Sequence, residues 1–185
     1  MRRFVIGAAC LVAVSAAAFA AVRMQDAPGL PKPGKEHEFL KKFEGTWTTK
    51  ETMTGPDGKA IVSEGSQVAT LACGGLWLIL DHKSSMMGQP FTGHGVMGYD
   101  LDKKKYTGVW VDNFIDYVMT YQDGKLEGNT LSWWCEAKDC STGKWEKAKM
   151  SHEVKDADHT VLKMIMKGPD GKDCEGMSIE FTRKK

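Results

Sequence analysis

The sequence lacks an excess of charge of either sign, because its 185 residues contain 25 Lys and Arg against 24 Asp and Glu. A nucleic-acid-binding domain needs a basic face to neutralise phosphates, and this balance does not provide one. Long apolar runs are missing outside the extreme N-terminus, which argues against an integral membrane protein. A chain of this length has room for one domain. We therefore expect one soluble domain without a nucleic-acid partner.

Motifs of the common enzyme classes are absent as well. The sequence contains no Gly-x-Ser-x-Gly, no His-Glu-x-x-His and no glycine-rich phosphate loop between a strand and a helix. No residue is therefore assigned a catalytic role, and no metal or cofactor is assigned. The function has to be inferred from the fold and from the side chains that the fold gathers.

Residues 1–20 have the layout of a secretory signal peptide. Arg2 and Arg3 give a positive start, residues 4–19 form an apolar run rich in Ala and Val, and Ala18-Phe19-Ala20 supplies small residues for a peptidase. Cleavage after Ala20 predicts an exported protein, periplasmic or extracellular, with 23 basic and 24 acidic side chains. A retained anchor is the alternative, although the apolar run is short for a span of roughly 20 residues.

Residues 21–35 are rich in Pro and Gly, which predicts a flexible lead-in to a domain over residues 36–185. One short helix is expected at residues 35–43, since Phe39, Leu40 and Phe43 share a face. Beyond it, turn signals such as Asp123-Gly124 separate alternating runs of strand length. The strands are predicted at roughly 46–54, 59–72, 76–86, 91–99, 104–112, 114–122, 125–135, 144–155, 160–167 and 172–183.

Short connections between these runs predict consecutive antiparallel strands. An open sheet would leave two unpaired edges, and closure into a barrel removes them. A sandwich is the alternative, but a Greek-key sandwich requires a long crossover connection that the hairpin spacing does not show. The predicted fold is all-β: a single up-and-down antiparallel barrel of about ten strands with a short N-terminal helix.

A helix that runs into Gly45-Thr46-Trp47 resembles the entry of lipocalin-like (calycin) barrels. The resemblance implies that Trp47 closes the barrel floor and that Arg183, on the last strand, packs across it. A wider pattern is similar to a bacterial family of unknown function, numbered 1579, which implies the same fold and no established activity. That pattern comprises Glu36-His37, Leu40, Gly45-x-Trp47, Gly74-Gly75-Leu76-Trp77, Met86-Met87-Gly88-x-Pro90-Phe91, Gly98-Tyr99-Asp100 and Gly108-x-Trp110-x-Asp112.

Four cysteines remain after the leader: Cys73, Cys135, Cys140 and Cys174. The strand order places Cys73 at one end of the barrel and the other three near the opposite rim, too far for a bridge to Cys73. We expect one disulfide, Cys135–Cys140, in the oxidising compartment outside the cytoplasm, with Cys140–Cys174 as the alternative. Cys73 is expected to be a small buried thiol.

The barrel interior is the predicted binding site. We expect it to hold a small, mostly apolar molecule, lined by Trp77, Trp110, Tyr117 and Trp133, with Asp112 supplying polarity. Six methionines in strand segments add adaptable apolar surface: Met97, Met119, Met150, Met164, Met166 and Met177. The alternative is that these side chains simply fill a solid core, as in a structural envelope barrel.

Other readings of the same residues stay open. His82 and His94 flank the Met86-Met87 turn and could form a soft copper site at one rim. A single inward His could ligate haem, and an acidic or His side chain could serve a cavity enzyme such as an isomerase. Asp112 and Asp116 could both point toward the top of the cavity, or act only as turn residues.

Overall fold

The computed structural model describes residues 29–55, 58–138, 144–167 and 171–185. The chain divides into two units, residues 1–30 and 31–185, and the second contains the folded domain. The predicted signal peptide and residues 21–28 of the lead-in lie outside the described residues. Within the described part, no helix has the length and apolarity that a transmembrane helix needs.

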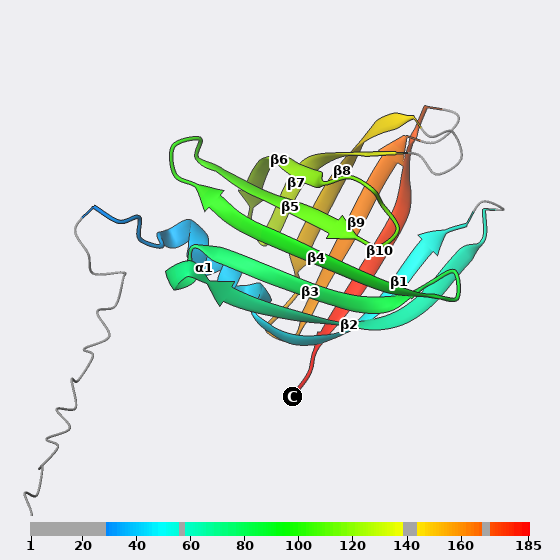
Figure 1. Cartoon of the computed structure of the whole chain (residues 1–185), viewed down its shortest axis with the longest axis horizontal. Helices are drawn as coiled ribbons and strands as arrows, with labels where there is room; N and C mark the ends of the chain where they lie inside the picture. Colours follow the sequence, from blue (N-terminus) through cyan, green and yellow to red (C-terminus); the bar gives the residue numbers. More distant parts are fainter. Residues whose placement is uncertain (1–28, 56–57, 139–143, 168–170) are drawn as a thin grey trace, which may run out of the picture. The chain divides into compact units, whose positions relative to one another are not determined.

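Ten antiparallel strands close into one barrel in which each strand pairs with its neighbours in sequence, and β1 pairs with β10 (Figure 1). This confirms the predicted fold class. The strands are β1 (Gly45–Thr54), β2 (Ala60–Ala72), β3 (Trp77–Met86), β4 (Gln89–Asp100), β5 (Lys105–Asp112), β6 (Met119–Glu127), β7 (Thr130–Lys138), β8 (Trp145–Val154), β9 (His159–Lys167) and β10 (Asp173–Arg183).

Alternation along the strands separates the interior from the surface. In β7, Leu131, Trp133, Cys135 and Ala137 are buried, whereas the residues between them are half-buried or exposed. Most other strands follow the same rule, and β6 and β10 depart from it where their register shifts. The short connections keep the strands in sequence order, and closure leaves no unpaired edge.

The predicted helix is present as α1 (Lys35–Leu40), followed by a 3₁₀ turn, η2 (Lys41–Phe43). Phe39, Leu40 and Phe43 pack into the barrel core, as their shared face predicts. Tyr106, at the start of β5, donates a hydrogen bond to the Glu36 carbonyl at 2.9 Å. These contacts place the helix at the end of the barrel where β1 and β5 begin.

One strand was placed wrongly from the sequence. Asp123-Gly124 reads as a hairpin turn, but β6 continues through it to Glu127 as a bulge, with Asp123 at φ 55° and an irregular register against β5 and β7. The hairpin turns instead at Gly128, where φ is 60°. Residues 113–118 form a loop, so the sixth strand begins later than predicted.

Candidate functional site

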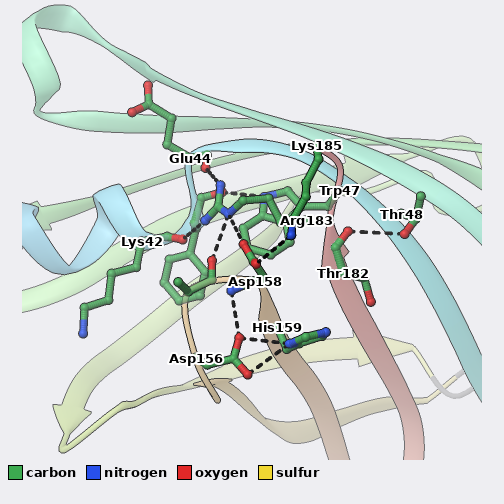
Figure 2. Close-up of polar contacts among 12 residues, drawn as sticks. Lys42, Glu44, Trp47, Thr48, Asp156, Asp158, His159, Thr182, Arg183 and Lys185 are labelled. Atoms are coloured by element: carbon green, nitrogen blue, oxygen red, sulfur yellow. Dashed lines mark hydrogen bonds and ion pairs between the residues drawn. The ribbon is translucent and has the colours of Figure 1, made fainter.

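Trp47 and Arg183 lie side by side at the floor of the barrel, where β1 begins and β10 ends. The Arg183 guanidinium carbon lies 4.1 Å from the Trp47 ring centre, the contact predicted between these two residues (Figure 2). Arg183 also donates to the carbonyls of Lys42, Glu44 and Ala157, so one side chain ties the turn η2 and the β8–β9 connection to the last strand. Trp47 Nε1 donates to the Phe43 carbonyl at 2.8 Å.

Gly45 makes this closure sterically possible. Its φ is 129°, a conformation that L side chains rarely adopt, and a Cβ there would lie 2.5 Å from Arg183 Nη1. The Gly-x-Trp pattern thus has a physical meaning in this chain. The glycine leaves space for the guanidinium, and the tryptophan two residues later supplies the ring beneath it.

Above the floor lies a buried carboxylate that sequence reasoning missed. Glu51 points inward from β1 and is only 4% exposed. His82 Nε2 lies 2.8 Å from Glu51 Oε1, which also accepts from Thr49 at 3.2 Å. Glu51 Oε2 accepts from Ser84 at 3.0 Å and from Ser63 at 3.3 Å. Four side chains therefore surround one carboxylate inside the barrel.

The Glu51–His82 contact crosses an entire strand, since the two residues lie on β1 and β3 with β2 between them. Gly65 of β2 permits the crossing. A Cβ at Gly65 would lie 2.5 Å from the Lys83 carbonyl, 2.6 Å from Ser84 Cβ and 2.7 Å from Thr49 Oγ1. The missing side chain lets Thr49 and Ser84 approach each other over β2 and reach the same carboxylate.

The network keeps Glu51 ionised. Burial by itself raises the pKa of Glu51, but the hydrogen bonds from His82, Ser84 and Thr49 and the attraction of His82 outweigh it, and the pKa is lowered overall. An ionised carboxylate only accepts hydrogen bonds, so His82 Nε2 carries the proton of this contact. The serine hydroxyls bond to Glu51 and not to His82, so the set lacks the serine–histidine contact of a hydrolytic triad.

Trp110 and Asp112 are brought together inside the barrel, as predicted. Trp110 Nε1 donates to Asp112 Oδ2 at 2.9 Å, and Asp112 Oδ1 accepts from the backbone of Phe114 and Ile115. Asp112 thus holds the start of the 113–118 loop as well as the indole.

The inner wall also carries a row of thioethers. Met53, Met177, Met164 and Met150 are successive cross-strand neighbours on β1, β10, β9 and β8, and Trp133 of β7 follows Met150. Met53, Met164 and Met177 are only half-buried although they face inward. These three inward-facing apolar side chains therefore keep part of their surface exposed.

Trp133 lies at the buried end of that row. Its ring centre is 4.9 Å from that of Tyr121, and its Nε1 is buried without a hydrogen-bond partner. Burial raises the pKa of Tyr121 above its ordinary value.

His152 also lies inside the barrel, where it contacts Thr160 at 2.9 Å. Burial lowers the pKa of His152 to about 3, so its ring stays neutral at physiological pH.

Two predicted lining residues lie elsewhere. Trp77 alternates with the buried Leu78 and therefore faces outward, where its ring covers Gly98 of β4. Tyr117 belongs to the 113–118 loop; its ring packs against the exposed Trp145 at 4.6 Å, and its hydroxyl accepts from the backbone of Lys138. Trp77 was assigned to the lining because it lies in a strand segment, without regard to which face it occupies. Tyr117 was assigned because the alternation of the sixth strand was extended into the loop.

The copper hypothesis is also wrong for the described residues. His82 is buried inside the barrel, whereas His94 is exposed on the outer face and contacts Asp81 at 2.6 Å. The part of the chain that the structure describes holds no group of three or more His, Cys, Asp or Glu suited to a metal ion. Asp116 does not point into the cavity either, because its side chain is 86% exposed beside Lys138.

The cysteines differ from prediction as well. Cys135 is a free thiol, because it faces the barrel interior and its Sγ points toward the Ala148 carbonyl at 3.8 Å; its predicted partner Cys140 lies outside the described residues. Burial raises the pKa of Cys135 to about 11. Cys73 is exposed, not buried, because it occupies the β2–β3 turn with φ 50°. Cys174 is exposed and free.

A hollow of about 470 Å³ lies next to α1, at the end of the barrel where β5 begins. It sits beside the β6 bulge and has both charge signs and two tyrosines in its lining: Lys35, Glu36, Tyr99, Lys104, Tyr106, Gly124, Lys125, Leu126 and Glu127. Burial and the charge of Glu36 raise the pKa of Tyr106 to about 12.

A closed antiparallel barrel with a short helix and a Trp–Arg contact at its floor defines a calycin-like barrel. The chain belongs to the DUF1579 family of proteins of unknown function, whose model matches residues 32–183. The comparison with curated proteins gives no match.

Two solved structures share the fold. Rv2717c from M. tuberculosis is 13% identical with a TM-score of 0.58, covering 82% of this chain and 99% of that one. The S-type phycobiliprotein lyase CPES from Guillardia theta is 14% identical with a TM-score of 0.56, covering 81% of this chain and 93% of that one. At these identities the likeness concerns the fold alone.

Proposed function

We propose that this protein binds a small, mostly apolar molecule inside its barrel. The supporting observation is the set of inward-facing apolar side chains that remain partly exposed while packing against the core: Leu71, Leu80, Tyr99, Trp110, Met119, Leu162, Met164, Met166 and Met177. A filled barrel would bury them. Thioethers on several neighbouring strands suit a lining that adapts to the shape of its ligand.

A fluorescence titration tests this proposal. The probe is 6-propionyl-2-dimethylaminonaphthalene, an uncharged fluorophore whose emission shifts to the blue in apolar surroundings. We expect saturable binding with a blue shift. Met164→Trp adds bulk to the interior and should weaken binding at least several-fold. Lys163→Trp adds the same ring on the outer face of the same strand, where Lys163 is exposed, and should leave binding unchanged.

Two results would contradict the proposal: no saturable binding to the unmodified protein, or equal effects of the two tryptophan substitutions. Circular dichroism and thermal unfolding of both variants establish that any loss of binding occurs in folded protein.

We also propose export of the chain, on the signal-peptide pattern of residues 1–20. N-terminal sequencing of the protein from its own host should give Ala21 as the first residue. An N-terminus at Met1 in the cytosolic fraction would refute export.

A further inference from the structure

The inward-facing positions of the barrel carry acidic charge with little basic charge to balance it. Glu51, Asp112 and Glu146 face inward on described strands. Among the inward strand positions that the structure describes, Arg183 is the single Lys or Arg, and it is engaged at the floor with Trp47 and three carbonyls. An anionic ligand would therefore meet carboxylates in the cavity without a free lysine or arginine to pair with.

Trp110 presents an aromatic face to this cavity. Its ring lies against β4 over two inward glycines, since a Cβ on Gly93 would be 2.2 Å from Trp110 Cζ2 and one on Gly95 would be 3.0 Å from Cε3. The glycines allow the indole to lie flat along the wall, with one face on the backbone. Trp110 is half-buried, so part of the ring surface remains accessible from the interior.

The surroundings of Trp110 favour a cation on that ring. Its Nε1–H is bonded to the Asp112 carboxylate, which increases the electron density of the indole and places a negative charge at its edge. The His82 ring lies edge-on to the Trp110 ring, with 6.3 Å between the two ring centres. On its other side, His82 contacts the Glu51 carboxylate. The aromatic face and the Asp112 carboxylate therefore attract positive charge, whereas the Glu51 carboxylate is already paired with His82.

We propose that the interior ligand is an apolar organic cation, such as a hydrophobic amine or quaternary ammonium compound, with its charged group on the face of Trp110. This inference rests on the proposed binding function and names the ligand class. The cation meets the Trp110 face and the charge of Asp112, while the apolar body lies against the aliphatic and thioether wall. Fatty acids and other carboxylates are disfavoured by the same charges.

Three ligands with the same ten-carbon chain separate the contribution of charge to the binding affinity from that of the apolar chain: decyltrimethylammonium, 1-decanol and decanoate. The affinity of each is measured by calorimetry at pH 7.5, below its micelle concentration. We expect the cation to bind roughly tenfold more tightly than the alcohol, and the carboxylate to bind most weakly. Decanoate binding as tightly as decyltrimethylammonium would overturn the inference while leaving the proposed function intact. Failure of all three to bind would overturn both.

Two variants locate the effect. Trp110→Leu should reduce the ratio of cation to alcohol affinity to near one, and Asp112→Asn should reduce it several-fold. The ratio is used because either change also alters the lining of the site. Trp145→Leu removes an exposed tryptophan from the outer face and should leave the ratio unchanged. An unchanged ratio in folded Trp110→Leu protein would overturn the assignment; if that variant does not fold, the ligand order in the unmodified protein still decides.

Discussion

Glu51 and His82 make a 2.8 Å contact inside the barrel although a whole strand separates β1 from β3. The contact depends on Gly65, because this residue has no side chain on the inner face of β2, between Glu51 and His82. The same carboxylate also accepts hydrogen bonds from Thr49, Ser63 and Ser84, so the contact is part of a larger polar network on the inner wall.

Gly65→Ala should destabilise the fold by about 1–3 kcal/mol, because the new Cβ meets the Lys83 backbone carbonyl, which cannot move aside easily. Urea denaturation measures the change. Gly176→Ala is the matched control, since its nearest atom is the flexible Met166 Sδ at 3.2 Å. Equal losses in the two variants would show that Gly65 has no special role.

Acid should weaken the fold partly through Glu51. The pKa of Glu51 is lower in the folded state than its ordinary value of 4.5. Such a group contributes its full stabilisation above the unfolded pKa and loses it as the pH falls through the folded pKa. The stability advantage of the unmodified protein over Glu51→Gln should therefore be full above about pH 4.5 and shrink below it. Urea denaturation across a pH series tests this, and an advantage that stays constant down to pH 3 would argue against it.

Arg183→Lys should cost about 1–3 kcal/mol, because lysine cannot donate to the carbonyls of Lys42, Glu44 and Ala157 while lying flat on Trp47. Thermal unfolding detects the loss. Lys184→Ala, at the exposed next position, is the control and should have little effect. A lysine variant as stable as the parent would mean that a charge alone closes the floor.

The cysteines should differ in reactivity. Cys73 and Cys174 are exposed, whereas Cys135 is buried and burial raises its pKa to about 11. Iodoacetamide at pH 8 should label the first two quickly and Cys135 only after unfolding. Peptide mass spectrometry gives the site-by-site rates. Rapid labelling of Cys135 in the native protein, or a peptide that links it to another cysteine, would contradict the described core.

The barrel itself follows from local information. Short turns between alternating runs leave few topologies, and the pair Trp47 and Arg183 completes the closure. The bulge at Asp123 was missed because Asp-Gly signals a turn equally well. Only the pairing of β6 with β5 and β7 shows that Asp123-Gly124 continues a strand.

The site was harder to predict because its key contacts are not local. Glu51 sits in a run of polar residues that reads as a solvent-facing strand, and no sequence spacing indicates that Gly65 opens a path from it to His82. Trp110 and Asp112 were found because both lie on one strand face, two residues apart. Trp77 was assigned to the interior only because it lies in a strand segment, and neighbouring residues of a strand face opposite sides, so the buried Leu78 leaves Trp77 on the outer face.

Native mass spectrometry of the protein purified from its own host tests the central claim most directly. A barrel that binds a small molecule should carry a non-peptide mass, present in the Lys163→Trp variant and lost in Met164→Trp. Bare polypeptide mass in the unmodified protein, or a bound mass that both variants retain equally, would contradict binding in the interior.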